Sequence, residues 1–176
     1  MVRIYTRTGD SGSTFCAALG TRVVKTHPLI EFMGAIDEAN SLLGYARIAC
    51  SDAVEDTLRW FQRLIFRLGF SLSGHSRITE EDVKTLEEIT DDYMKNVDLK
   101  GFILPGGSEC SARIHIARTV VRRAERRLVA VIESGIEVKA GKDSLMMALK
   151  ALNRLSDALF AMATALQAKE GNLEYL

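Results

Sequence analysis

A run of nine small or polar residues, TRTGDSGST, lies near the start of the chain at positions 6–14. Its two glycines permit backbone conformations in which neighbouring amide groups converge. Its hydroxyls and the guanidinium of Arg7 are donors suited to phosphate oxygens. Asp10 would repel phosphate, so we expect it to hold a hydroxyl, an arginine or a magnesium-bound water. By composition alone, the run fits a polyphosphate-binding loop and a flexible polar tail equally well.

Charged residues also lie beside the apolar face of the helix expected over residues 108–134. On a wheel of ~100° per residue, that face consists of Ile114, Ala117, Val121, Ala124, Leu128 and Val131. The line along its edge consists of Arg118, Arg122 and Glu125, with Arg126 slightly further round. Arg123 and Arg127 point away from the face and are expected to be solvated. Taken alone, the line is typical of a rim of salt bridges over the edge of the core.

Two other expected helices also place polar residues at the edges of their apolar faces. Asp37 and Asn40 do so in the first helix, and Asn153 and Asp157 in the last. An aspartate in such a place needs a cationic partner, because burying an unpaired charge is costly. Small residues for close helix packing would also explain the first helix. Three helices with the same feature nevertheless indicate a shared polar site, although the sequence does not decide whether their edges meet.

Several familiar chemistries lack their motifs in this chain. A ferritin-like di-metal site needs Glu-x-x-His pairs, and none of His27, His75 and His115 has a glutamate three residues before it. We therefore predict no metal-ligand set, and we expect His115 to be a packing or hydrogen-bonding residue. The segment GIEVKAGKDS resembles a P-loop but has one residue too many between its glycines and no strand before it. GxSxG, HExxH and GxGxxG motifs are absent from the sequence.

The composition is that of a globular protein with one sizeable core. The 176 residues include 23 basic and 23 acidic side chains, and this balance argues against non-specific nucleic-acid binding. The N-terminus lacks the apolar run of a signal peptide, and no apolar run reaches the ~20 residues that span a bilayer, so no membrane contact is expected. Cys16, Cys50 and Cys110 form no CxxC motif, so reduced thiols in the cytoplasm are expected rather than a disulfide framework.

Helices must position these polar residues, because only two prolines interrupt the chain. Helical periodicity, caps and glycine stops predict five helices, over residues 28–50, 52–73, 79–97, 108–134 and 143–169. The N-terminal segment before them is expected to be extended, without convincing strands. The expected fold is all-α: a single domain over 1–176, with an extended segment over 1–27 and a five-helix bundle over 28–170.

The chain resembles the PduO-type ATP:cob(I)alamin adenosyltransferase family over nearly its whole length. The resemblance rests on four blocks in the family's order, TRTGDSGST, GTRVVKTHPLIEFMGAIDEANSLLG, FILPGGSECSARIHIARTVVRRAERR and LNRLSDALF. Four ordered blocks are far more specific than one short motif. One departure is TFCAALG after the threonine loop, where the family often has Ser or Gly and then Leu. The resemblance implies a homotrimer of five-helix bundles that binds ATP near its subunit interfaces, partly through the N-terminal segment.

The resemblance also implies roles for particular residues. The implied ATP-binding residues are Thr6, Arg7, Thr8, Gly9, Asp10, Gly12, Thr14, Lys25, Arg122, Glu125, Arg126 and Asn153. Asp37 and Arg118 resemble a charged pair that links neighbouring subunits. Phe102, in FILPGG, resembles the aromatic residue beside the corrin ring. The implied catalytic residues are Phe102, Arg122 and Lys25.

The implied reaction is attack by the cobalt(I) of reduced cobalamin on C5′ of ATP, which yields adenosylcobalamin and triphosphate. Such an in-line displacement needs positioning and stabilisation of the leaving triphosphate more than acid–base groups. ATP, Mg²⁺ and cobalamin are the implied ligands, and a reductase and a cobalamin-dependent acceptor enzyme are the implied partners. Two alternatives stay open: a non-catalytic ATP-sensing helical bundle, and a helical interaction module that binds no nucleotide.

Overall fold

The computed structural model describes residues 3–176 of the chain, so the first two residues of the expected N-terminal segment lie outside the described range. Within it, an antiparallel hairpin of two strands precedes five helices. The elements are β1 (Ser13–Cys16), β2 (Thr21–Val24), α1 (Pro28–Arg47), α2 (Asp52–Ser71), α3 (Glu80–Met94), α4 (Glu109–Glu133) and α5 (Lys142–Lys169). The five predicted helices are confirmed. The hairpin corrects the expectation of an N-terminal segment without strands.

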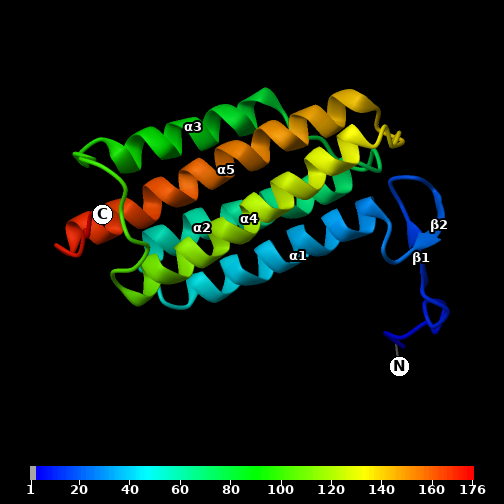
Figure 1. Cartoon of the computed structure of the whole chain (residues 1–176), viewed down its shortest axis with the longest axis horizontal. Coiled ribbons are helices and arrows are strands. Elements are labelled where there is room, and N and C mark those ends of the chain that lie inside the picture. Colours follow the sequence, from blue (N-terminus) through cyan, green and yellow to red (C-terminus); the bar gives the residue numbers. More distant parts are fainter. Residues whose placement is uncertain (1–2) are drawn as a thin grey trace.

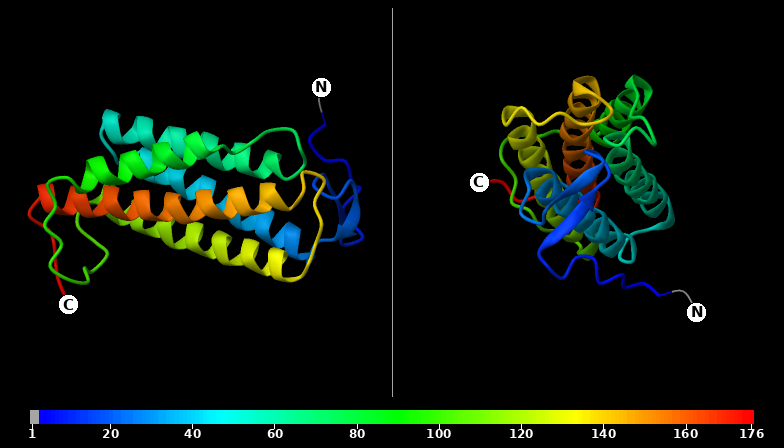
Figure 2. Two further views of the ribbon diagram at one scale, coloured as in Figure 1. Left: turned by 90° about the horizontal axis from the view of Figure 1, so that it is seen from above. Right: turned by 90° about the vertical axis from the view of Figure 1, so that its right-hand side faces the viewer.

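The helices lie side by side along the long axis of the molecule (Figure 1). α4 packs between α1 and α5, while α3 packs on α5 and α2 on α1. The hairpin lies across one end of the helices, as the end-on view in Figure 2 shows. The connection between α3 and α4 lies at the other end, together with the C-terminus (Figure 1). The fold therefore separates TRTGDSGST from FILPGG by the length of the helices.

Local signals in the sequence explain where three of the helices begin. α1 starts with Pro28 after His27, whose Nδ1 accepts a hydrogen bond of 3.2 Å from a backbone amide of the first turn. α3 starts at a capping box between Thr79 and Asp82. Ser108 caps α4 by accepting from a first-turn amide. The predicted starts of these helices are confirmed to within one residue.

The predicted apolar face of α4 is buried in the core. Its fully buried residues are Ile114, Ala117, Val121, Ala124, Leu128 and Val131. They pack in one cluster with residues of the flanking helices, such as Phe32 and Leu43 from α1 and Leu152 and Leu159 from α5. Burying a side chain of Leu or Val size contributes about 1.5–3 kcal/mol, so this face fixes α4 firmly between its neighbours.

Two arginines on the outer flank of α4 face solvent, as expected, and each also lies near a carboxylate of α1. Arg123 forms an ion pair with Glu38, and Arg127 lies 3.6 Å from the Glu31 carboxylate, both on α1. Exposed pairs of this kind stabilise a fold by at most about 1 kcal/mol, but they define which side of α4 faces α1.

Within residues 3–176, no helix combines the length and apolar character needed to cross a bilayer.

A disulfide between Cys50 and Cys110 joins the residues after α1 to the first turn of α4. It corrects the expectation of reduced, unpaired thiols. The two Cα atoms are 5.0 Å apart, a separation that a disulfide spans without backbone movement. Because the cysteines are 60 residues apart in sequence, no local motif signals the pair. Cys16 stays free and is buried.

Reduction of this disulfide is expected to destabilise the protein without unfolding it. Closing a loop of this length removes about 4 kcal/mol of chain entropy from the unfolded state, which corresponds to a fall of roughly 10 °C in melting temperature for a chain of this size. Thermal unfolding with and without a dithiol reductant measures the difference. The variant Cys110→Ser should melt at the reduced temperature under both conditions. Equal melting temperatures for the native chain in both conditions would refute the link.

Candidate functional site

The predicted phosphate loop is closed by backbone hydrogen bonds against the hairpin. The Gly12 amide donates to the Gly9 carbonyl at 3.2 Å, and the Lys25 amide donates to the Gly12 carbonyl at 2.9 Å. Gly12 has a φ of 80°, a conformation that favours glycine. The Lys25 ammonium covers Gly9, since a Cβ built on that glycine would lie 3.2 Å from Nζ. The structure thus brings Lys25 onto the loop, as the resemblance implied.

Arg22, which no sequence motif marks, holds the two sides of this loop together. From β2, its Nη2 donates to the Ser13 carbonyl at 3.0 Å and to the Ser13 hydroxyl at 2.8 Å. The same nitrogen also contacts the Thr8 carbonyl. A guanidinium presents several donors in a rigid plane, so one side chain can bridge separate carbonyls. The signal that could have revealed it, an arginine in a short strand beside a glycine loop, is weak.

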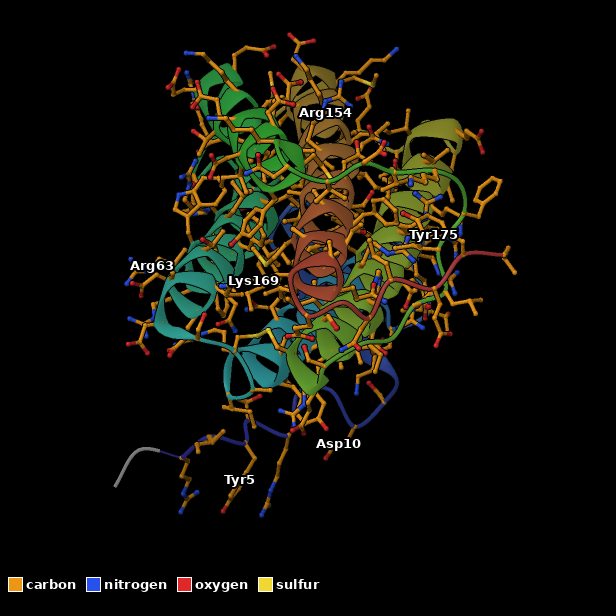
Figure 3. The ribbon with its side chains drawn as sticks, turned by 90° about the vertical axis from the view of Figure 1, so that its left-hand side faces the viewer. Tyr5, Asp10, Arg63, Arg154, Lys169 and Tyr175 are labelled. Atoms are coloured by element: carbon orange, nitrogen blue, oxygen red, sulfur yellow. A yellow bond between two sulfur atoms is a disulfide. The ribbon has the colours of Figure 1, made fainter. Side chains whose placement is uncertain are left out.

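The remaining loop side chains lie at the surface of the molecule. The Thr6 and Thr8 hydroxyls are 2.9 Å apart, and Arg7 stacks over the Tyr5 ring at 5.4 Å. Figure 3 shows Tyr5 and Asp10 projecting outside the helices. These donors are free to face a ligand rather than the core.

The departure TFCAALG anchors the hairpin to the helices. Cys16 and Ala18 are buried, and Ala18 accepts a backbone hydrogen bond of 2.8 Å from Lys139, in the connection between α4 and α5. The Lys139 side chain also covers Gly20, which has a φ of 72°. The segment over residues 17–20 therefore makes a tight turn between β1 and β2. This turn places Lys25, which follows β2, beside the loop.

A second polar group lies halfway along α4 and α5. The Asn153 Nδ2 donates to the Glu125 carboxylate at 2.9 Å, and the Arg154 Nη1 donates to the side-chain oxygen of Asn153, Oδ1, at 2.6 Å. Arg122 and Arg126 are exposed on the same helix as Glu125. Burial raises the pKa of the nearby Asp157, an effect that Arg154 opposes and Glu125 reinforces. The polar edges of α4 and α5 therefore meet here, whereas Asp37 and Asn40 of α1 line a separate groove with α2, so one chain brings together only two of the three edges expected to share a site.

The Asp37 and Arg118 side chains are not brought together within one chain. The Arg118 guanidinium lies over the Phe160 ring at 5.7 Å, and its Nε is buried without a hydrogen-bond partner among residues 3–176. Burial, and then the positive charge of Arg122, lower the pKa of Arg118. Asp37 is exposed at a groove of about 440 Å³ between α1 and α2, whose walls include Met33, Phe66 and Phe70. Within residues 3–176, neither Asp37 nor Arg118 therefore forms an ion pair with an opposite charge.

Phe102 stands apart from both polar groups. Its side chain is 82% exposed in the connection between α3 and α4. The C-terminal residues run beside it: the Leu176 amide donates to the Phe102 carbonyl at 3.0 Å, and the Leu104 amide donates to the Glu174 carbonyl at 2.9 Å. Tyr175 lies at this end of the molecule in Figure 3.

The hairpin loop, the Arg122 group and Phe102 lie at different positions along the length of α4. At 1.5 Å per residue, Arg122 lies about 16 Å before the end of α4 that carries the hairpin, and about 20 Å after the end that carries the Phe102 connection. Within residues 3–176, no group of three or more His, Cys, Asp or Glu side chains could hold a metal ion. A magnesium ion would therefore need ligand oxygens from phosphate, with at most one or two carboxylates such as Asp10.

Comparisons with known proteins agree on one family. The cobalamin adenosyltransferase family model matches residues 4–166. The corrinoid adenosyltransferase of Bacillus subtilis is 38% identical over 187 residues, covering 99% of this chain and 92% of the relative. The corrinoid adenosyltransferase PduO of Salmonella typhimurium is 40% identical over 172 residues, covering 92% of this chain. The chain spans only 49% of that relative, about half of its length.

Solved structures give the same answer. A variant of the PduO-type ATP:corrinoid adenosyltransferase from Lactobacillus reuteri, complexed with cobalamin and ATP, superimposes with a TM-score of 0.82 at 31% identity, over 98% of this chain and 97% of that one. Another variant of the Lactobacillus reuteri enzyme, complexed with ATP, has a TM-score of 0.83 at 32% identity, over 96% of both chains. Sequence and fold together show that this chain belongs to the cobalamin adenosyltransferase family.

Proposed function

We propose that this protein transfers the 5′-deoxyadenosyl group of ATP to the cobalt(I) of reduced cobalamin, giving adenosylcobalamin and triphosphate. The observation that carries the proposal is the closed glycine loop with the Lys25 ammonium lying over Gly9. It places a cation beside a glycine loop in a chain whose solved relatives include complexes with ATP and with cobalamin. The family alone supports the chemistry, and the loop supports where the triphosphate binds.

The proposed reaction is a single displacement at carbon. A cobalt(I) electron pair forms the bond to C5′ of ATP, and the bond from C5′ to the triphosphate oxygen breaks, so the electron pair of that bond leaves with triphosphate. The developing negative charge is on the leaving group, where Lys25, Arg7 and the threonine hydroxyls of the loop would receive it. Mg²⁺ would arrive with the phosphates and contact Asp10. Reduction of cobalt(II) to cobalt(I) requires an electron from a reductase partner.

We further propose that a complete site needs two chains. Arg122 lies about 16 Å along α4 from the end beside the hairpin, so we infer that a loop from one chain meets Arg122, Glu125, Arg126 and Asn153 of its neighbour. In this arrangement Asp37 of one chain pairs with Arg118 of the next, which would supply the partner each lacks within its own chain. A closed ring of such head-to-tail contacts is cyclic, and a homotrimer is the ring that the resemblance implies.

Phe102 is proposed to cover the lower face of the corrin ring. Excluding water and the lower axial ligand there favours formation of cobalt(I), and an apolar ring on an exposed connection is suited to that contact. Adenosylcobalamin would then pass to a cobalamin-dependent acceptor enzyme. The cytoplasm, which supplies ATP and reductant, is the proposed location.

The test is an anaerobic assay with ATP, Mg²⁺ and chemically reduced cobalamin, in which the visible spectrum and triphosphate are followed together. We expect light-sensitive adenosylcobalamin to form in step with triphosphate. Tight ATP binding without either product would favour an ATP-sensing bundle instead. Absence of ATP affinity would favour a helical interaction module and leave the loop as a polar tail.

Replacing Arg22 by alanine is expected to raise the KM for ATP about tenfold, because the loop loses the side chain that bridges Thr8 and Ser13. Turnover at saturating ATP should change little. Amide hydrogen exchange should also become faster at Gly12 and Lys25. The control is Arg63→Ala, at an arginine that projects from the outer surface of α2 (Figure 3). An unchanged KM with unchanged exchange would show that Arg22 does not hold the loop.

Replacing Phe102 by alanine is expected to lower turnover at least about tenfold while leaving the Kd for ATP unchanged, because the ring contacts the corrin and not the nucleotide. Initial rates and equilibrium ATP binding measure the two effects separately. Leu99→Ala, at another exposed apolar residue of the same connection, is the matched control. A loss of ATP binding equal to the loss of turnover would disprove this assignment.

Replacing Asp37 by alanine is expected to weaken assembly by roughly 3 kcal/mol, because Arg118 would be left in the interface without its counter-ion. Sedimentation equilibrium measures the change. Glu38→Ala is the control, since this adjacent carboxylate pairs with Arg123 inside its own chain. A full-strength trimer with full activity in Asp37→Ala would contradict the pairing between chains.

A further inference from the structure

A buried chain of polar groups links α4 and α5 to the connection that carries Phe102. His115 on α4 is 3% exposed and Gln167 on α5 is 1% exposed. The His115 Nε2 lies 2.9 Å from the Gln167 Oε1, and the Gln167 Nε2 donates to the Leu104 carbonyl at 3.2 Å. With the Gln167 Nε2 directed at the Leu104 carbonyl, its Oε1 faces His115. An amide oxygen can only accept, so the His115 Nε2 carries the proton in this network.

The Gln167 side chain also packs directly against the turn at Gly107, in the connection between α3 and α4. Gly107 adopts a φ of 83°, and a Cβ built there would lie 2.6 Å from the Gln167 Cγ and 2.8 Å from the Ser111 hydroxyl. That hydroxyl donates to the Gly106 carbonyl at 2.5 Å. The turn is therefore seated directly on the Gln167 side chain, with no room for a residue larger than glycine.

His115 holds Gln167 in place rather than taking part in chemistry. Its ring packs edge-on against Phe160 with centroids 6.3 Å apart, and its Nδ1 is buried without a partner among residues 3–176. Burial is the main cause that lowers the pKa of His115, so the ring is neutral near pH 7 and keeps a single donor. That donor fixes the orientation of the Gln167 amide.

Phe102 depends on such anchors because its own side chain is largely exposed and has little packing to fix it. Ile103, which follows Phe102, forms an isolated antiparallel bridge with Tyr175. The C-terminal residues therefore hold one side of this short segment, and Gln167 holds the Leu104 carbonyl, two residues after Phe102. We infer that Gln167, oriented by His115, is a positioning residue for Phe102 at the corrin face. This inference rests on the proposed function, which places Phe102 there.

Replacing Gln167 by methionine tests the inference, because methionine keeps the length of the side chain and removes both hydrogen-bonding groups. We expect turnover to fall about tenfold with the Kd for ATP unchanged. The electron paramagnetic resonance spectrum of bound cob(II)alamin should regain the splitting from a lower nitrogen ligand. Amide exchange should become faster over residues 102–107, a readout that needs no activity. Thr164→Val, at another buried polar residue of α5, is the control and should change none of these.

A double-mutant cycle separates positioning from a general weakening of the core. If Gln167 acts through Phe102, the combination of Gln167→Met with Phe102→Ala is no slower than Phe102→Ala alone. Fully additive losses would overturn the inference, as would normal turnover in Gln167→Met. His115→Phe, which keeps the contact with Phe160, should repeat the effect in milder form if the methionine variant does not fold. Normal turnover in Phe102→Ala would refute the proposed role of Phe102, and the inference with it. A slow Phe102→Ala beside a normal Gln167→Met would refute the inference alone.

Discussion

The packing of α4 between α1 and α5 is the constraint on which every candidate functional group depends. The Phe102 connection enters α4 at its first residue, the arginine line occupies its middle, and the hairpin is hydrogen-bonded to the connection that leaves it. The buried alanines Ala117 and Ala124 let neighbouring helices approach closely. A larger residue at either place would force these helices apart or strain the core, and it would move all three groups at once.

This arrangement also bears on the proposal that two chains build one nucleotide site. A rigid helix cannot fold its middle back toward its end, so Arg122 stays about 16 Å along α4 from the end beside the hairpin. The fold presents the loop and the arginine line at different places on the surface, where in the proposed assembly a second copy would combine them. The groove between α1 and α2 holds the exposed Asp37 among apolar side chains, and in the proposed assembly Arg118 of a neighbouring chain would pair with it there.

Much of the helical fold could be predicted from the sequence, because helices depend on local signals. Periodicity and caps such as Thr79 and Ser108 located them to within a few residues. The hairpin was missed, since each strand has four residues and little alternation of apolar and polar side chains. The disulfide and the bonds from Arg22 join residues whose closeness exists only in the folded chain. The same is true of Gln167, which has no neighbouring motif to mark it as a partner of His115.

The charges of the proposed site favour assembly and nucleotide binding together. Arg118 and Arg122 lie one helical turn apart, and their mutual repulsion helps to lower the pKa of Arg118 in the isolated chain. In the proposed trimer, Asp37 of the neighbour neutralises the first arginine and triphosphate neutralises the second. Each anion thus relieves repulsion that would otherwise oppose keeping these cations in place. Because coupling between two binding equilibria is reciprocal, nucleotide must tighten the assembly by the same factor by which assembly tightens nucleotide binding.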